Sequence, residues 1–360
     1  MNIPVTKPFL PTYTEFSEYL KGIWERNWLT NNGPLVNELE LKLKSYLDVN
    51  HLLFMTNGTI ALQIAIKALG LSGEVITTPF SYVATTSSIV WENCQPVMVD
   101  IDEDSLNIDP AKIEAAITPK TTGILATHVF GNPCMVDAIE RIAKKHNLRV
   151  IYDAAHAFGT TYRGRSLLSY GDVSTCSFHA TKLFHTVEGG SVTTNDPQLL
   201  RRMAMMRNFG HTSLTDIDGV GINGKNSEIH AAMGLCNLNY IGDIINKRKA
   251  DFAIYKNGLE DLPLRFQKIA SETGYNYSYF PIIFESEDIL LRVQEQLNLN
   301  NIYPRRYFYP TLCNLSYVSN QHAEKADSIS KRVLCLPLYS EITNPEIDMI
   351  CRYIKRTIRY

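Results

Sequence analysis

One lysine, Lys182, stands in surroundings that could make its amine a nucleophile. It lies in the stretch 172–191, DVSTCSFHATKLFHTVEGGS, between two runs of small and β-branched residues that predict strands. Its neighbours Thr181, Leu183 and Phe184 are mostly apolar. An amine in such surroundings loses part of its hydration, which lowers its pKa and makes it more nucleophilic. A solvated surface lysine is the alternative, so the interpretation depends on what else the sequence provides.

A carboxylate that could work with this lysine is Asp153. It ends the apolar run 148–152, which predicts a buried strand, and open α/β sheets bind ligands at the carboxyl edge of such strands. A carboxylate there can keep a pyridine nitrogen protonated. Together with a lysine that condenses with an aldehyde, it supplies the protein's part of pyridoxal phosphate chemistry. A simple helix cap is the alternative role for Asp153.

A possible anion site lies upstream, in the sequence Thr56-Asn57-Gly58-Thr59. These residues follow the apolar run 52–55 and open a predicted helix over 60–69. Such an arrangement aims free backbone amides and a threonine hydroxyl at an anion such as phosphate. An ordinary helix cap explains the motif equally well in isolation. The occurrence of all three features in one chain favours a cofactor site.

The composition is that of an ordinary globular protein. The chain has 360 residues, 45% of them hydrophobic and 20% charged, with a net charge of −2. This balance disfavours nucleic acid as a partner. Seven cysteines without a CxxC pair disfavour a disulfide framework and a zinc site, so we expect no metal. The first residues lack a signal-peptide pattern and no run is long enough to span a membrane, which predicts a cytoplasmic protein.

Strands and helices alternate through the first two thirds of the chain. Apolar spacing predicts helices over 13–24, 36–47, 82–91, 136–145, 197–208 and 227–238, with Asp196 as a cap. Short apolar runs predict strands over 74–78, 96–100, 122–129 and 149–152. This alternation predicts an α/β fold with a mostly parallel sheet covered by helices on both faces.

The character of the chain changes near Ile244. Beyond this point it is more polar and richer in tyrosine, with predicted strands over 278–284 and 332–339 and predicted helices over 290–297 and 345–358. We therefore predict a large cofactor-binding domain over residues 1–245 and a smaller C-terminal α/β domain over 246–360.

Four motifs give the chain a resemblance to a known family. NGT, TPFSYVATTSSI, YDAAHAFG and SFHATKLFHTVEGG occur in this order, and the likeness extends from WLTNNGP near residue 30 to LPLY at 336–339. The chain resembles the DegT/DnrJ/StrS family of nucleotide-sugar aminotransferases. The resemblance implies the fold of aspartate aminotransferase, which is fold type I of the pyridoxal phosphate enzymes, and it implies pyridoxal phosphate as the cofactor.

The resemblance also implies roles for individual residues. Lys182 would bind the cofactor covalently and act as acid and base, and Asp153 would hold the ring nitrogen protonated. Tyr82 would stack on the ring and His156 would hydrogen-bond its phenolic oxygen, although many relatives have glutamine there. The phosphate would be bound by the residues Gly58, Thr59, Ser177 and Asn223.

Asn223 belongs to a loop that the resemblance places across a dimer interface. Relatives usually read YNYRMSE where this chain has GINGKNSE, so Gly224 replaces an aromatic residue and Lys225 replaces arginine. Lysine lacks the forked guanidinium, which puts the contact made by that arginine in doubt. If Asn223 keeps its role, the enzyme is a homodimer with shared active sites.

The implied substrates are a nucleotide-linked keto sugar and an amino acid donor, which in most relatives is L-glutamate. Thr30, His185, Glu188 and Tyr309 are the expected substrate contacts, and arginines beside Tyr309 would suit a diphosphate. The best match is dTDP-4-keto-6-deoxyglucose, with an amino sugar for a surface polysaccharide such as O-antigen as product.

Several alternatives remain open at this point. Amination could occur at carbon 3 of a dTDP-3-keto-6-deoxyhexose or on a free sugar or cyclitol ketone. The chain could also be a regulatory protein that keeps the fold without turnover. A dehydratase of this family would have histidine in place of Lys182, so that alternative is disfavoured.

Overall fold

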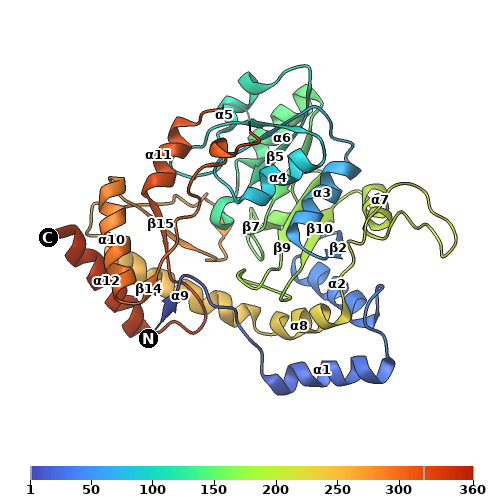
Figure 1. Ribbon diagram of the computed structural model, residues 1–360, viewed down its shortest axis with the longest axis horizontal. Helices are drawn as coiled ribbons and strands as arrows, with labels where there is room; N and C mark the ends of the chain where they lie inside the picture. The colour runs from blue at the N-terminus through green and yellow to red at the C-terminus, as the bar shows by residue number, and fades with distance from the viewer. Residues whose placement is uncertain (1, 319–320, 360) are drawn as a thin grey trace.

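A seven-stranded sheet forms the centre of the molecule in the computed structural model, which describes residues 2–318 and 321–359 (Figure 1). The strand order is β2-β10-β9-β6-β5-β3-β4. The neighbours from β9 to β4 are parallel, whereas β10 is antiparallel to both β2 and β9. The predicted α/β fold with a mostly parallel sheet is therefore confirmed. The strands are β2 (His51–Met55), β3 (Glu74–Thr77), β4 (Gln95–Met98), β5 (Thr121–Thr127), β6 (Arg149–Asp153), β9 (Val173–Ser177) and β10 (Gly190–Thr194).

Helices cover both faces of this sheet. Because side chains alternate along a strand, Leu52 and Phe54 of β2 pack in one core while Leu53 and Met55 pack in another. The first core contains the helices α1, α2, α6 and α8, and the second contains α3, α4 and α7. Their bounds are α1 (Tyr13–Arg26), α2 (Pro34–Tyr46), α3 (Gly58–Ala68), α4 (Val83–Trp91), α6 (Val136–His146), α7 (Pro197–Arg207) and α8 (Glu228–Leu238).

The helix caps explain several of these boundaries. Asp196, predicted as a cap, accepts hydrogen bonds from the backbone amides of Gln198 and Leu199 at the start of α7. Asn57 caps α3 in the same way through the amide of Ile60. These bonds satisfy amides that have no partner inside a helix.

A separate core, the C-terminal core, lies in the C-terminal part. It is built on the antiparallel sheet β11-β13-β15 and on three helices that pack together. The predicted strands and helices of this part are present, with bounds that differ by up to three residues. The elements are α9 (Ile241–Leu259), β11 (Arg265–Phe266), β13 (Phe280–Ile283), α10 (Glu287–Leu299), β15 (Val333–Leu336) and α12 (Asn344–Arg359).

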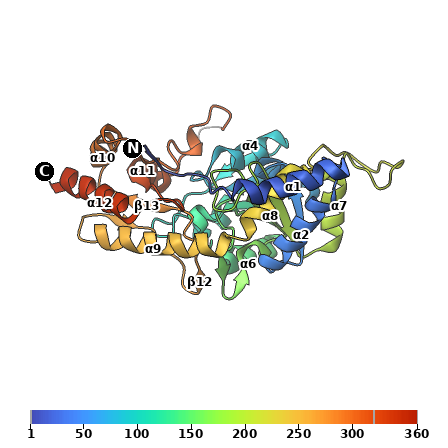
Figure 2. The same ribbon diagram turned by 90° about the horizontal axis from the view of Figure 1, so that it is seen from below.

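Helix α9 connects the two parts. Its first residues, Ile241 and Ile244, pack in the first core of the large sheet, whereas Tyr255 and Leu259 pack in the C-terminal core. In Figures 1 and 2 it runs from the C-terminal helices towards α8. The N-terminal residue Ile3 also packs in the C-terminal core. The predicted boundary at 245/246 falls within α9, and the division of the chain at that point stays a prediction.

The two parts share an apolar interface. Phe80 and Phe130 from the large part pack with Ile283, Phe308 and other residues of the C-terminal part. The remaining elements are short or peripheral. They are β1 (Ile3–Pro4) paired with β14 (Ile302–Tyr303), α5 (Pro110–Ile113), α11 (Glu324–Arg332), the sheet of β12 (Thr273–Gly274), β7 (Thr161–Tyr162) and β8 (Arg165–Ser166), and the short 3-10 helices η1 (Glu114–Ala116), η2 (Val129–Gly131), η3 (Leu167–Ser169) and η4 (Leu312–Asn314). Within the described residues, every helix is too short or too polar to span a membrane.

Candidate active site

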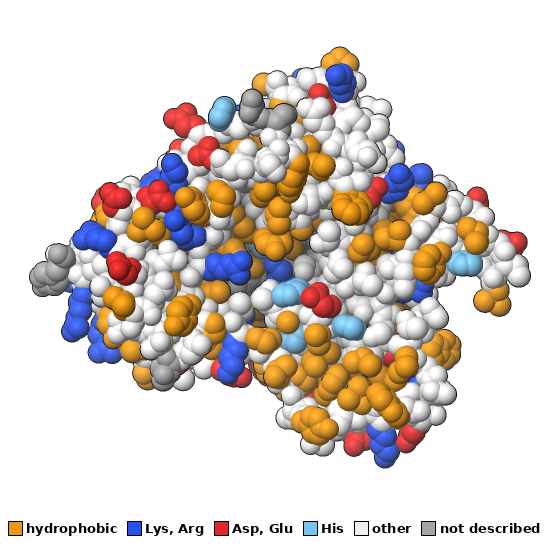
Figure 3. Space-filling view, in the orientation of Figure 1, with side chains coloured by type: hydrophobic (Ala, Val, Ile, Leu, Met, Phe, Trp, Pro, Cys, Tyr) orange, Lys and Arg blue, Asp and Glu red, His pale blue; other side chains and the backbone are white. Residues whose placement is uncertain are grey.

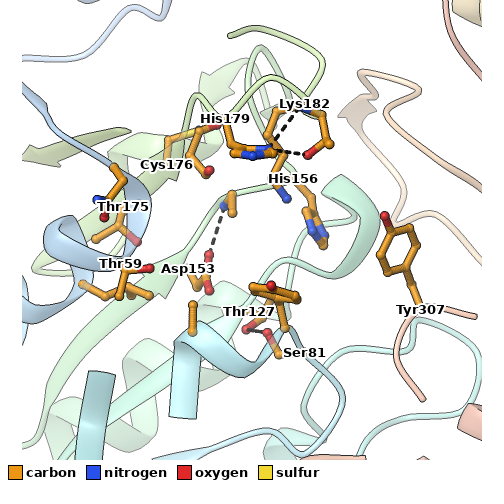
Figure 4. Close-up of a pocket in the computed structure, with 18 of the residues that line it drawn as sticks. Thr59, Ser81, Thr127, Asp153, His156, Thr175, Cys176, His179, Lys182 and Tyr307 are labelled. Carbon is orange, nitrogen blue, oxygen red and sulfur yellow. Dashed lines mark hydrogen bonds between the residues drawn. The ribbon is translucent and has the colours of Figure 1, made fainter. Parts of the chain in front are cut away.

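A cavity lies at the carboxyl edge of the parallel strands (Figure 4). Asp153 ends β6 and Ser177 ends β9, and both line the cavity together with Thr59 and Lys182. The C-terminal part closes the opposite side with Tyr279, Arg305, Tyr307 and Phe308. Figure 3 shows a central hollow with Lys or Arg side chains on one side and acidic and histidine side chains on the other. The fold thus brings together in one place the lysine, the acid and the anion motif that the sequence singled out.

Lys182 lies in the loop between β9 and β10. Its backbone amide donates to the carbonyl oxygen of His179 at 2.8 Å, and the following residues Leu183 and Phe184 are buried. This packing fixes the loop beside the sheet. Burial lowers the pKa of the Lys182 amine, and the nearby Asp153 charge acts in the opposite direction. The amine is therefore closer to its neutral, nucleophilic form than a surface lysine would be.

Asp153 is buried, with 6% of its surface exposed. One carboxylate oxygen accepts from the Thr85 hydroxyl at 2.7 Å, and the other accepts from the Ala155 amide at 3.1 Å. The hydroxyl of Ser81 lies within 2.8 Å of Thr85 and within 3.0 Å of Thr127, which extends the hydrogen-bonded chain. Burial raises the pKa of Asp153 although these bonds and Lys182 oppose the shift. A cation in the cavity beside Asp153 would stabilise its ionised form.

His156 is held in one orientation by its neighbours. Its Nδ1 accepts a hydrogen bond from the amide of Phe130 at 3.2 Å, so Nε2 is the nitrogen that carries the proton. The ring is stacked near the rings of Phe130 and Phe308, at centroid distances of 6.1 and 5.7 Å. Burial holds the pKa of His156 well below its usual value, and the nearby Lys182 adds to this. A neutral imidazole with a proton on Nε2 can donate a hydrogen bond to a ligand oxygen.

The start of α3 forms a close-packed cradle. A Cβ atom on Gly58 would lie 3.0 Å from the Cβ of Ser177, and one on Gly190 would lie 2.6 Å from the backbone carbon of Asn57. Glycine at both positions lets the helix end approach the ends of β9 and β10. As a result, the first amides of α3 and the hydroxyls of Thr59 and Ser177 border the same cavity.

These features fit pyridoxal phosphate. The amides at the start of α3 suit its phosphate group, because a helix N-terminus favours anions. Asp153 has neutral hydrogen-bond donors, and a protonated pyridine nitrogen would add the cation that a buried carboxylate needs. Tyr82, which is 55% exposed beside the cavity, has a ring that a bound aromatic group could cover.

The other residues predicted to bind substrate or cofactor lie partly at the cavity and partly away from it. Glu188 lines the cavity, and its carboxylate lies 3.5 Å from Nε2 of His179. His185 is buried under the loop, where its Nε2 lies 2.7 Å from the carbonyl oxygen of Phe9. In the part of the chain that the structure describes, the cavity lining lacks four predicted residues: His185, Thr30, Tyr309 and Asn223.

Lys225, which stands where relatives have arginine, braces its own chain. Its amine donates to the side-chain oxygen of Asn208 at 2.6 Å and lies 4.7 Å from the ring centroid of Phe209. Burial lowers the pKa of this amine. Lys225 therefore supports the segment after α7, while Asn223 beside it is exposed.

Sequence reasoning missed several cavity residues. Tyr279 comes from the C-terminal part, and only the folded chain brings it to Lys182. Arg305, by contrast, is one of the arginines beside Tyr309 that the sequence predicted near a diphosphate. Thr85 lies inside the motif TPFSYVATTSSI, but nothing in that motif shows that its hydroxyl reaches Asp153. The tyrosine-rich composition of the C-terminal part was the one available signal for Tyr279.

Comparisons with known proteins identify a family and several similar proteins. The model of the DegT/DnrJ/EryC1/StrS aminotransferase family matches residues 12–355. A dTDP-4-amino-4,6-dideoxy-D-glucose transaminase of Shigella dysenteriae is 43% identical over 362 residues, covering 99% of this chain and 98% of the relative. A GDP-perosamine synthase of Escherichia coli O157:H7 is 31% identical over 363 residues, covering 98% of this chain and 97% of the relative.

A solved structure gives the same result for the fold. The crystal structure of DesI in the presence of its TDP-sugar product superimposes with a TM-score of 0.95 at 32% identity. The match covers 99% of this chain and 93% of that chain.

Proposed function

The chain belongs to the DegT/DnrJ/EryC1/StrS aminotransferase family, and we propose that it uses pyridoxal phosphate to aminate carbon 4 of dTDP-4-keto-6-deoxyglucose. The amino donor in this proposal is L-glutamate. The observation that carries the proposal is the meeting of Lys182, Asp153 and the start of α3 in one cavity. The choice of sugar is supported by the 43% identity, over almost the whole chain, to the Shigella dysenteriae enzyme.

Each residue of the cavity has a role in this proposal. Bound pyridoxal phosphate supplies an electron sink for the pair released when the donor's α-carbon loses its proton. The Lys182 amine takes that proton, and its lowered pKa makes it an effective base. Asp153 holds a proton at the pyridine nitrogen, and the Nε2 proton of His156 faces a ligand oxygen. Gly58, Thr59 and Ser177 bind the phosphate.

The sugar nucleotide would enter from the side formed by the C-terminal part. Arg305 is exposed at the cavity, 4.8 Å from the ring of Tyr307, which leaves its guanidinium available to a diphosphate. Arg306 is instead bound to Glu287 at 2.6 Å and to the Lys331 carbonyl oxygen at 3.0 Å. Of the two neighbouring arginines, Arg305 is therefore our choice for the diphosphate.

The direct test is product analysis. The purified protein, loaded with pyridoxal phosphate, is incubated with L-glutamate and either the 4-keto or the 3-keto dTDP sugar, and the product is identified by NMR. We expect an amine at carbon 4 from the 4-keto sugar. Amination of the 3-keto sugar alone would refute the choice of substrate while keeping the aminotransferase. The Lys182→Ala variant should give no product from either sugar.

We also propose a homodimer in which Asn223 reaches the partner's phosphate site. The segment 209–222 exposes Leu214, Ile217 and Val220, which are 100%, 63% and 79% exposed, and a second copy of the chain would cover them. Asn223 itself is exposed at the end of this segment. Losing one charge-assisted bond to phosphate costs about 1.5–3 kcal/mol, or roughly a ten- to hundredfold loss of affinity.

Mixing two variants tests this sharing. Asn223→Ala and Lys182→Ala homodimers each lack one contribution, whereas a heterodimer has one site with both defects and one intact site. At a cofactor concentration that leaves Asn223→Ala largely empty, activity should rise after the subunits exchange. If exchange is confirmed by mass spectrometry and activity stays low, Asn223 serves its own chain.

A further inference from the structure

A tyrosine of the C-terminal part, Tyr279, contacts the amine of Lys182. Its hydroxyl oxygen lies 3.5 Å from Lys182 Nζ and is the hydrogen-bond partner of that amine in the described part of the chain. The two residues are 97 positions apart. Tyr279 directly precedes β13, so the sheet of the C-terminal core sets its position. The contact therefore joins the C-terminal part to the reactive lysine.

The ring of Tyr279 is fixed by aromatic neighbours. It lies 4.7 Å from the ring of His156, 5.4 Å from that of Phe130 and 5.7 Å from that of Tyr307, measured between centroids. These rings come from both parts of the molecule and pack around the side chain, which limits its movement. The hydroxyl of Tyr279 thus marks a fixed point in the cavity wall.

The chemistry of this hydroxyl suits a lysine that must change its protonation state. Burial raises the pKa of the Tyr279 phenol, so it stays neutral. A neutral phenol accepts an N–H bond from an ammonium group and donates its own O–H to a free amine. It can therefore hold Lys182 in either state without adding a charge to the cavity.

We propose that Tyr279 positions the Lys182 amine for proton transfer, so that the C-terminal part takes part in the reaction through this contact. The proposal rests on the proposed pyridoxal phosphate chemistry, in which Lys182 must act as a free base. A flexible lysine side chain has many rotamers, and a fixed hydroxyl selects the one that points into the cavity. Tyr279 is a positioning residue because it acts through Lys182.

The test compares two tyrosine variants that each remove the hydroxyl of one half-buried side chain. Tyr279→Phe removes the contact with Lys182. The control, Tyr275→Phe, removes a hydrogen bond of 2.8 Å to the carbonyl oxygen of Phe130 and leaves Lys182 untouched. Both variants are loaded with pyridoxal phosphate and mixed with excess L-glutamate. The single-turnover rate is followed by the absorbance of the bound cofactor, with ordinary and α-deuterated glutamate.

We expect Tyr279→Phe to slow the rate at saturating glutamate by about 10- to 100-fold, because misplacing a catalytic group has effects of this size. The glutamate concentration at half-maximal rate should change little, and the isotope effect should increase because proton transfer becomes slower. Tyr275→Phe should keep the wild-type rate within about threefold. Equal losses in the two variants, or a wild-type rate and isotope effect in Tyr279→Phe, would overturn the proposal.

A second readout needs neither donor nor sugar. Cofactor-free protein is mixed with pyridoxal phosphate, reduced with borohydride at short times, and the modified fraction of Lys182 is measured by mass spectrometry. We expect slower modification in Tyr279→Phe than in Tyr275→Phe, and equal rates would count against positioning. This arm stays decisive if the proposed sugar proves wrong, since that failure would appear only in product analysis.

Discussion

The close approach of β10 to the start of α3 leads to a sharp prediction for Gly190→Ala. The new Cβ atom would lie 2.6 Å from the backbone carbon of Asn57, 2.7 Å from its oxygen and 2.7 Å from the nitrogen of Gly58. Unstrained contacts between carbon atoms are about 3.5–4.0 Å, so the helix end must move by roughly 1 Å. No side-chain rotation can relieve the clash, because the facing atoms belong to the backbone.

Such a shift should weaken cofactor binding and also destabilise the fold. A hydrogen bond of about 2.9 Å that lengthens by roughly 1 Å is lost, and each bond to phosphate contributes about 1.5–3 kcal/mol. We therefore expect a dissociation constant for pyridoxal phosphate at least about tenfold higher. The overpacking itself should destabilise the protein by about 1–3 kcal/mol.

The assay titrates cofactor-free protein with pyridoxal phosphate and follows the absorbance change, with thermal unfolding measured in parallel. Gly242→Ala is the matched control, because its new Cβ in α9 would meet no atom within 4 Å. That variant should leave the affinity unchanged and add about 0.5–1 kcal/mol of stability. A folded Gly190→Ala protein with wild-type affinity would refute the phosphate site at the start of α3.

Three further predictions follow from the same structure. Asp153→Asn should bind the cofactor with altered absorbance and lose most single-turnover activity, because an amide cannot hold the pyridine nitrogen protonated; near wild-type turnover would make Asp153 a purely structural residue. Arg305→Met should raise the KM for the sugar nucleotide by roughly tenfold or more through loss of a charge-assisted contact. Arg306→Met should mainly lower the melting temperature. A KM that rises in Arg306→Met alone would show that Arg306, and not Arg305, binds the diphosphate. His128 is buried with a pKa of about 3, below its ordinary value of 6.5, because burial disfavours its charged form. The unfolded chain therefore binds the extra proton, and stability should fall by up to about 1.4 kcal/mol per pH unit as pH drops from 6.5 towards 3. His128→Asn, which keeps an acceptor for the Cys134 amide, should flatten this slope in urea unfolding, and an unchanged slope would show that other groups cause it.

The parts of the site that sequence could predict share one property. Lys182, Asp153 and Thr59 each follow or precede a strand of the parallel sheet, and the carboxyl ends of such strands meet at one edge. Their meeting in one cavity therefore follows from the βα pattern once the strands are recognised. Short apolar runs and helical apolar spacing were sufficient to recognise the strands and helices. The family motifs added the cofactor and the sugar.

The parts that sequence could not predict depend on contacts between distant segments. His185 lies three residues after Lys182 in the same loop, yet its ring turns inwards to the carbonyl oxygen of Phe9, which no local pattern indicates. Tyr279 reaches the cavity because the large part and the C-terminal part pack together through Phe130 and Phe308. Distances of this kind are set by tertiary packing, and a motif contains no information about them.

The protonation states of Asp153 and Lys182 explain why the packing of the two parts matters for the proposed transamination. Burial raises the pKa of Asp153 and lowers that of Lys182, so each group is pushed towards its neutral form. A base needs a neutral amine, whereas the partner of a pyridinium needs an ionised carboxylate. The Thr85 hydroxyl and the Ala155 amide favour the ionised form of Asp153. Tyr279 offers Lys182 a neutral partner, which leaves the effect of burial in place. The large part thus supplies a carboxylate that can hold a cation, while the C-terminal part leaves the lysine free to act as a base.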